Sequence, residues 1–262
     1  MLLVNDVGNT ITSLGVYKAA ELVAHWRLTT ARARTVDEYG VHARNLFALA
    51  GLDFKAIDAV AIASVVPPLN YTLKRMSEVY FHLTPLFVDH STDTGLPILY
   101  QPPSDVGADR IVDAVAAIHK YGAPCIIVDF GTATTFNAIN KSGEYLGGVI
   151  TPGIMISTDA LFERTAKLPR VDIKRPQKVI GSSTITAMQS GLYHGYVGLV
   201  DGVLRKMLDE LGGARVIATG GLAPLIATGS ELIELVDDTL TLEGLRLVYE
   251  RQRPDQTIDH GR

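Results

Sequence analysis

Two stretches of the chain show the same succession of an apolar strand, a polar turn and a second strand. Residues 2–17 read LLVNDVGNTITSLGVY, and residues 125–140 read CIIVDFGTATTFNAIN. A shift of 123 residues superimposes identical side chains: Asp6 on Asp129, Gly8 on Gly131 and Thr12 on Thr135. Apolar runs bounded by glycine and polar residues are typical of strands. A third strand follows in each copy, at 22–28 and 145–151, so the pattern predicts a duplicated β-meander.

Helices alternating with single strands are expected after each meander. The expected helices cover residues 36–50, 69–81, 108–121, 154–167, 184–211 and a short stretch from 222. The expected strands cover residues 56–66, 85–89 and 215–219, and the Pro- and Gly-rich segment 93–107 reads as a structured loop. This order predicts an α/β fold of two duplicated domains, divided into residues 1–115 and 116–262.

Composition narrows the classes of protein that fit. Apolar residues make up 47% and charged residues 20% of 262 residues, which excludes a disordered chain. The net charge of −4 argues against nucleic acid as a partner. Cys125 is the one cysteine, which excludes an intrachain disulfide and a multi-cysteine zinc site. The N-terminus lacks the features of a signal peptide, and the long uncharged run 179–200 is too polar to span a membrane. We therefore expect a cytoplasmic protein with no membrane partner.

Familiar phosphate-binding and nucleophile motifs do not occur. The chain contains no Walker-type phosphate loop, no Gly-x-Gly-x-x-Gly after the first strand and no Gly-x-Ser-x-Gly. The two Asp-x-Gly turns, Asp6–Gly8 and Asp129–Gly131, are the strongest signal instead. A glycine after a strand lets backbone N–H groups approach phosphate, and a cation can bridge phosphate to the carboxylate. A single such turn would usually only close a hairpin, but two at matching positions favour a nucleotide cleft.

The segment Gly107-Ala108-Asp109-Arg110 opens the helix predicted at 108–121. Asp109 either complements the helix dipole or acts as a general base that orients an attacking hydroxyl. Arg110 either binds an anionic group or forms a surface ion pair. Asp113, one turn further on, is expected to be solvated.

Three weaker signals leave two interpretations each. Thr219-Gly220-Gly221 is either a surface for adenosine or a tight strand-to-helix turn. One hydroxyl of the segment 181–184 is expected to cap the helix that follows, while Thr184 alternatively faces a ligand. Tyr100 is either a packed loop ring or a wall of a substrate pocket.

Together these residues resemble the type III pantothenate kinases of the acetate and sugar kinase/Hsc70/actin superfamily. The resemblance spans nearly the whole chain and rests on these segments: Asp6–Thr10, Tyr100–Pro103, Gly107–Arg110, Asp129–Thr135, Gly147–Gly153, Leu168–Pro169 and Leu240–Leu245. It implies two ribonuclease H-like domains with the active site in the cleft between them, and a homodimer. It also implies ATP-dependent phosphorylation of pantothenate, the first step of coenzyme A biosynthesis.

The resemblance assigns roles by position. ATP would bind to Asp6, Val7, Gly8, Asn9, Thr10, Ile11, Thr12, Ser13 and Thr132. Pantothenate would contact Tyr100, Gly107, Ala108, Asp109, Arg110 and Thr184. Asp109 would accept the proton and Asp129 would hold K⁺ or NH₄⁺, while Asp6 would meet the Mg²⁺ of ATP directly or through water. Asn5 and Ile11 depart from the family pattern, because an apolar and a polar residue are expected there.

Two rival functions remain open at this stage. One is a different kinase or a phosphatase on the same fold, which the presence of Tyr100, Asp109 and Arg110 disfavours. The other is a non-enzymatic regulatory factor. Three carboxylates, Asp6, Asp109 and Asp129, favour an enzyme over a binding module.

Overall fold

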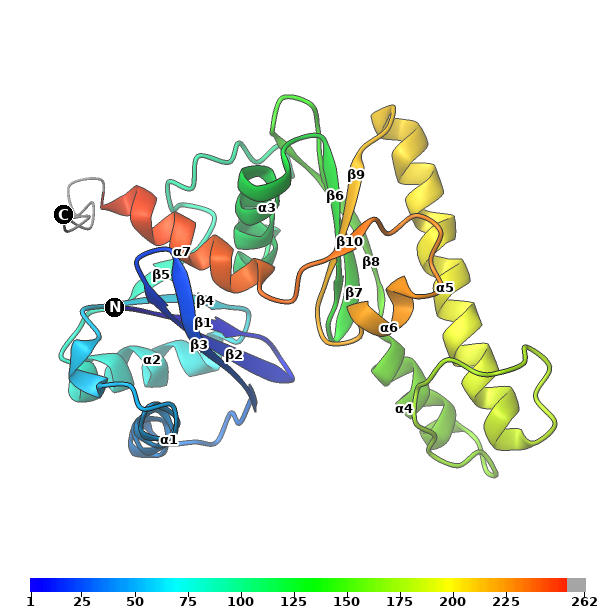
Figure 1. Ribbon diagram of the computed structural model, residues 1–262, viewed down its shortest axis with the longest axis horizontal. Helices are drawn as coiled ribbons and strands as arrows, with labels where there is room; N and C mark the ends of the chain where they lie inside the picture. The colour runs from blue at the N-terminus through cyan, green and yellow to red at the C-terminus, as the bar shows by residue number, and fades with distance from the viewer. Residues whose placement is uncertain (254–262) are drawn as a thin grey trace. The chain divides into compact units, whose positions relative to one another are not determined.

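A computed structural model describes residues 1–253 and contains two compact units (Figure 1). Among the described residues, the first unit comprises 1–96, 100–116 and 240–253, and the second comprises 97–99 and 117–239. Each unit is built on a five-stranded sheet with helices packed against it. The predicted α/β class is therefore confirmed.

The first sheet has the strand order β3-β2-β1-β4-β5. Its strands are β1 (Leu2–Val7), β2 (Ile11–Lys18), β3 (Glu21–Thr29), β4 (Ala59–Ser64) and β5 (Leu86–Val88). The first three form the antiparallel meander, and β4 and β5 run parallel to β1. Alternate residues of β1 point to opposite faces of the sheet, so this strand contributes to two cores.

Helices cover both faces of the first sheet. On one face, α1 (Val36–Leu49) and α2 (Pro67–Met76) pack on Leu3 and Val7. On the other, α3 (Ala108–Tyr121) and α7 (Leu240–Gln252) pack on Leu2 and Val4. Short 3₁₀ turns at Phe54–Ala56 and Pro103–Asp105 and a π-helical turn at Ser77–Phe81 complete the unit.

The second sheet has the order β10-β9-β6-β7-β8 and so repeats the first. Its strands are β6 (Cys125–Phe130), β7 (Ala133–Ile139), β8 (Tyr145–Pro152), β9 (Arg215–Thr219) and β10 (Leu235–Val236). The meander β6–β8 is antiparallel, and β9 and β10 are parallel to β6 and to each other. The helices of this unit are α4 (Ile154–Arg164), α5 (Thr184–Leu211) and α6 (Ala223–Ala227).

The duplication extends to an irregularity in the sheet. A register shift separates Val16 from Tyr17 in β2, and the same shift separates Ala138 from Ile139 in β7, 122 residues further on. The offset drops from 123 to 122 because the first turn of the second meander is one residue shorter. Thr12 pairs with Val7 and Thr134 with Phe130, so Thr134, and not Thr135, is the structural counterpart of Thr12.

Most predicted elements are confirmed, and the helices at 108–121 and 184–211 have the predicted bounds. The expected helix at 69–81 begins at Pro67 and continues after Met76 as the π-helical turn. Helix α7 had no predicted counterpart. A Cβ on its Gly244 would lie 2.0 Å from the Val112 carbonyl oxygen, so α7 approaches α3 backbone to backbone.

Helix α7 groups with the first unit, because Leu242, Leu245 and Val248 fill its core. The division at residues 115 and 116 stays a prediction. Within residues 1–253, every helix is too short or too polar to meet the requirements of a membrane span.

Candidate active site

The hairpin between β1 and β2 carries the first Asp-x-Gly turn. Asp6 is half-buried near the end of β1, directly across from Ser13 of β2. The Gly8 N–H donates to the Ile11 carbonyl over 3.0 Å, and a Cβ on Gly8 would lie only 2.9 Å from that oxygen. Glycine is therefore required for this turn, which leaves Asn9 exposed.

Two threonine side chains stabilise this turn by hydrogen bonds. Thr30 Oγ1 donates to the Gly8 carbonyl over 2.7 Å and lies 2.9 Å from Thr12 Oγ1. Thr12 is 5% exposed and lies on the sheet face that packs against α1 and α2, opposite to the face of Asp6. Its side chain therefore shapes the hairpin from the rear.

Asp109 lies in the first turn of α3, where Gly107 gives it room. Its Oδ1 accepts a hydrogen bond of 2.8 Å from the Arg110 N–H, and a Cβ on Gly107 would lie 2.4 Å from the same oxygen. Burial raises the pKa of Asp109, because it removes water from the charged carboxylate, and the Arg110 N–H and guanidinium oppose that rise. A desolvated carboxylate with a raised pKa is suited to accept a proton.

Arg110 and Tyr100 come together beside Asp109. The Arg110 guanidinium carbon lies 6.0 Å from the centre of the Tyr100 ring, a cation–π contact. Arg110 is 7% exposed, so the surface ion pair considered for it does not apply. The solvated state expected for Asp113 is also wrong: this side chain is 1% exposed, because α3 is buried on more than one side.

Asp129 occupies the corresponding place at the end of β6. It stands across from Thr135 on β7 and beside Thr219 on β9. A Cβ on Gly220, whose φ is +90°, would lie 2.4 Å from Asp129 Oδ1, and one on Gly131 would lie 3.3 Å from Oδ2. The turn after β9, which had two open interpretations, therefore leaves space for the Asp129 carboxylate.

The other predicted residues of the second unit are exposed. Thr132 lies in the β6–β7 turn, where its carbonyl accepts from Gly153 N–H over 3.1 Å. Ser183 is the N-cap of α5 and forms a capping box with Thr186, so the cap is identified and Thr184 stays exposed in the first turn. The predicted substrate residues are thus divided between the two units.

A buried polar network in the second sheet was not predicted. Tyr145 and Asn137 are fully buried, and they connect by hydrogen bonds to Thr135. An asparagine inside an otherwise apolar strand segment was the signal that could have revealed it.

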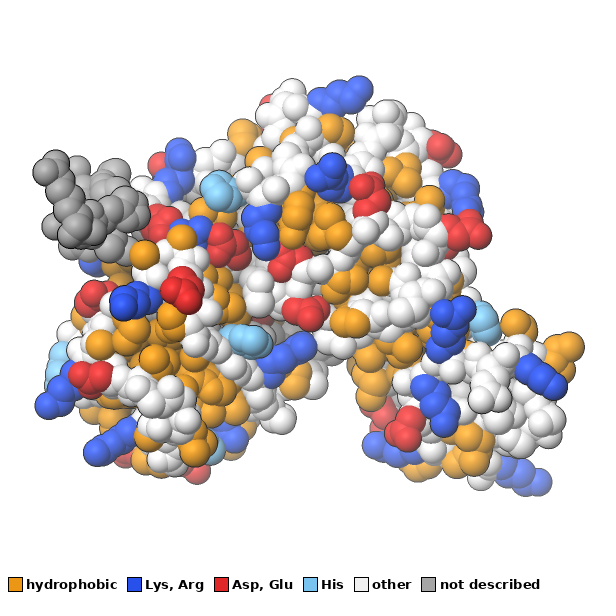
Figure 2. All heavy atoms as spheres, viewed as in Figure 1, with side chains coloured by type: hydrophobic (Ala, Val, Ile, Leu, Met, Phe, Trp, Pro, Cys, Tyr) orange, Lys and Arg blue, Asp and Glu red, His pale blue; other side chains and the backbone are white. Residues whose placement is uncertain are grey.

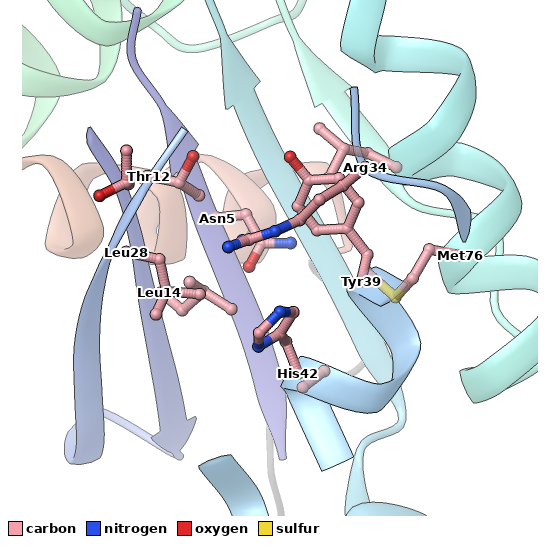
Figure 3. Close-up of a pocket in the computed structure, with 11 residues that line it drawn as sticks. Asn5, Thr12, Leu14, Leu28, Arg34, Tyr39, His42 and Met76 are labelled. Carbon is pink, nitrogen blue, oxygen red and sulfur yellow. The ribbon is translucent and has the colours of Figure 1, made fainter. Parts of the chain in front are cut away.

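A small cavity lies behind β1 (Figure 3). Its lining includes Asn5 and Thr12 of the sheet, Tyr39 and His42 of α1, and Arg34. Asn5 is 2% exposed, and its Oδ1 has no hydrogen-bond partner within the described part of the chain. The departure from the family pattern noted at this position therefore buries an amide oxygen that lacks a hydrogen-bond partner among the described residues.

Both Asp-x-Gly turns fit a cation that is shared with other oxygen ligands. Within residues 1–253, no three His, Cys, Asp or Glu side chains converge as in a closed metal site. Asp6 and Ser13 face each other across β1 and β2, as do Asp129 and Thr135 across β6 and β7. Carboxylate and hydroxyl oxygens are suitable ligands for hard cations that keep waters or phosphate oxygens as further ligands.

Comparison with known proteins identifies the family. The model of the family described as type III pantothenate kinase matches residues 2–206. A type III pantothenate kinase from Koribacter versatilis (strain Ellin345) is 57% identical, and the alignment covers 100% of both chains. The chain belongs to the type III pantothenate kinase family. The resemblance inferred from the sequence is thereby confirmed.

Solved structures support the fold of this pantothenate kinase family member. A Campylobacter jejuni protein, named for the Baf family of transcriptional activators, matches with a TM-score of 0.60 and 18% identity over 97% of this chain and 99% of its own. A Sinorhizobium meliloti protein, named as a 2-dehydro-3-deoxygalactonokinase, matches with a TM-score of 0.58 and 12% identity over 100% and 99%. At these identities the likeness shows the fold alone.

Proposed function

We propose that this chain transfers the γ-phosphoryl group of ATP to the primary hydroxyl of pantothenate and so catalyses the first step of coenzyme A biosynthesis. The observation that carries the proposal is the full-length match to type III pantothenate kinases, supported by the Asp109 carboxylate at the start of α3 beside the buried cation Arg110. A base next to a cation matches a substrate that has a reactive hydroxyl and a carboxylate.

Asp109 accepts the proton of the attacking hydroxyl. Phosphoryl transfer depends mainly on positioning and on charge stabilisation, so the base must be aligned before the reaction. The hydrogen bond from Arg110 N–H and the space at Gly107 define where Oδ1 lies. The raised pKa makes this carboxylate a stronger base than an ordinary aspartate.

Arg110 and Tyr100 bind pantothenate together with the backbone of Gly107 and Ala108. The guanidinium is buried and lies 6.0 Å from the centre of the ring, and its burial strengthens its attraction for an anionic substrate group. Thr184 supplies an exposed hydroxyl from the second unit.

ATP binds to segment 6–13 and Thr132, and the kinase family implies a divalent cation with it. The Gly8 N–H is engaged by the Ile11 carbonyl, and the turn leaves Asn9 and Thr10 exposed, where backbone N–H and hydroxyl groups suit phosphate oxygens. Mg²⁺, when bound, offsets the phosphate charge, and Asp6 holds it directly or through water. Ile11 is exposed and apolar, so its contribution is through its backbone.

Asp129 is proposed to hold K⁺ or NH₄⁺. Its carboxylate would repel phosphate unless a cation lay between them. Activity should rise steeply when KCl or NH₄Cl replaces NaCl at constant ionic strength, and Asp129→Ala should abolish that response. Equal activity in sodium and potassium would contradict this assignment.

A homodimer is proposed in which the edge of the second sheet forms part of the contact between the two copies. Apolar side chains are exposed on edge strand β8 and on the neighbouring α4, among them Ile150 (60%) and Met155 (53%). Figure 2 shows apolar side chains among charged ones around α4. A second copy that covers them would remove apolar surface from water. Sedimentation should show a dimer that Ile150→Lys dissociates, whereas Val41→Lys on α1 (54% exposed) leaves it intact.

The reaction itself is tested by incubating the purified chain with pantothenate, ATP and Mg²⁺, with and without K⁺. The expected result is phosphopantothenate and ADP in equal amounts. Absence of the phosphorylated product under all of these conditions, from a folded protein, would overturn the proposed function.

A further inference from the structure

A chain of hydrogen bonds runs through the second sheet and ends at Thr135, which stands opposite Asp129. The Tyr145 hydroxyl on β8 donates to Asn137 Oδ1 over 2.9 Å, and Asn137 Nδ2 on β7 donates to Thr135 Oγ1 over 3.2 Å. Tyr145 and Asn137 are both 0% exposed, so water does not compete for these bonds. The network therefore transmits a defined orientation from one side chain to the next.

The direction of the bonds determines what Thr135 can do. Because the phenol donates to the amide oxygen of Asn137, the amide nitrogen faces Thr135. A threonine hydroxyl has one hydrogen to donate, and accepting from Asn137 leaves that hydrogen for another acceptor. The two buried residues thus prepare Thr135 as a donor.

Asp129 is the acceptor that the strand register offers. Thr135 and Asp129 are directly opposed in the antiparallel pair β6–β7, which places their side chains on one face with Cβ atoms about 5 Å apart. The Asp129 oxygens lie against the turns of Gly131 and Gly220, which limits the positions that the carboxylate can occupy. No hydrogen bond joins the Thr135 and Asp129 side chains in this structure, and one formed when a cation binds would hold the carboxylate ionised in one of these positions.

We propose that Tyr145 and Asn137 are positioning residues that act through Thr135 to orient the Asp129 carboxylate for a monovalent cation. This inference rests on the proposed cation site at Asp129. The network sets the affinity for K⁺, and Tyr145 and Asn137 themselves touch neither the cation nor the substrates. Removing any member should weaken K⁺ binding more than it changes the KM for ATP or pantothenate.

The test titrates K⁺ at constant ionic strength against wild type and the variants Thr135→Val, Tyr145→Phe and the double variant. Thr135→Val should raise the K⁺ concentration for half-maximal activity by about tenfold or more, since hydrogen bonds to charged groups contribute that much. Tyr145→Phe should have a smaller effect, and the double variant should match Thr135→Val because both act along one path. Thr135→Ser should retain the response.

Thr134→Val is the matched control. Thr134 adjoins Thr135 in β7, is 1% exposed and lies on the opposite face, across from Phe130 of the core beneath α5. This variant should titrate as wild type does. Circular dichroism confirms that each variant is folded before it is compared.

A second readout does not depend on turnover. K⁺ should raise the melting temperature of wild type above its value in Na⁺, and this difference should shrink in Thr135→Val and Tyr145→Phe. If wild type shows the K⁺ effect, Asp129→Ala lacks it and Thr135→Val keeps it in full, the positioning role is overturned while the cation site stands. If wild type itself shows no K⁺ effect in melting or activity, both the cation site and the positioning role are overturned. Pantothenate phosphorylation is measured separately and can stand in either case.

Discussion

A methyl group on Gly107 would lie 2.4 Å from the Oδ1 atom of Asp109. The next nearest side chain to that position is Val65, whose Cγ1 atom would lie 3.3 Å away. A side chain added at Gly107 would therefore collide mainly with the Asp109 carboxylate, which must rotate to make room.

Gly107→Ala should lower kcat by about tenfold to hundredfold while the protein stays folded, because a displaced base is poorly aligned with its hydroxyl. Steady-state kinetics and a melting curve measure the two effects. Gly191→Ala on α5, where a Cβ meets nothing within 4 Å, is the control and should keep full activity. An unchanged kcat in Gly107→Ala would show that the position of Oδ1 does not matter.

Asp109→Asn should stabilise the unliganded protein at neutral pH. Burial raises the pKa of Asp109, so the folded state favours the protonated carboxyl and is destabilised by the charged carboxylate. As the pH falls through the raised pKa of Asp109 toward about 4, the ordinary value for an aspartate, the stability of wild type therefore rises relative to that of the Asp109→Asn variant. The variant should melt higher than wild type at pH 7, and the gap should close near pH 4. Asp105→Asn, at an exposed position, should show no such pattern; a gap that is the same at both pH values would contradict the burial effect.

The sequence predicted the turns and helix starts of the site better than the tertiary packing around them. The two Asp-x-Gly turns and the start of α3 at Ala108 could be located because strands, glycine turns and helix starts have local patterns. The burial of Asp113 could not, since it depends on what packs on the far side of α3. The same holds for α7, whose Gly244 has its role only against Val112, distant in the sequence.

Contacts between strands were equally hidden. The offset of the repeat placed Thr12 on Thr135, but the shorter turn in the second meander changes the pairing by one residue. A single residue of register turns a side chain to the other face, so Thr12 lies on the core face of its sheet, whereas Thr135 lies on the face of Asp129. The approach of Gly220, which follows β9, to Asp129 of β6 likewise joins residues distant in the sequence, so no local sequence pattern predicts it.

Asp6→Asn should impair the use of Mg²⁺–ATP. A neutral amide is a weaker ligand for a hard cation, so the Mg²⁺ concentration for half-maximal activity should rise at least about tenfold. Magnesium titrations at fixed ATP measure it. Asp53→Asn, at the exposed cap of a 3₁₀ turn, should leave the titration unchanged. A matching titration in Asp6→Asn would mean that Asp6 only shapes the hairpin.

Asn5→Leu should stabilise the first unit. The buried Oδ1 atom has no partner within the described chain, and the cavity beside it is lined by Leu14, Leu28 and Met76 as well as by polar groups such as His42, so an apolar side chain removes a desolvation cost. The expected gain is about 1–3 kcal/mol, seen in denaturant unfolding. A loss of stability would contradict the desolvation cost assigned to the Asn5 amide oxygen.

The most direct test of the central claim compares kcat for pantothenate phosphorylation in wild type and Asp109→Asn at saturating ATP, Mg²⁺ and K⁺. An amide cannot accept the hydroxyl proton, so kcat should fall by about 10²–10⁴-fold. The KM for ATP should stay within a few-fold of wild type. A variant whose kcat is within a few-fold of wild type would contradict the assignment of Asp109 as the proton acceptor.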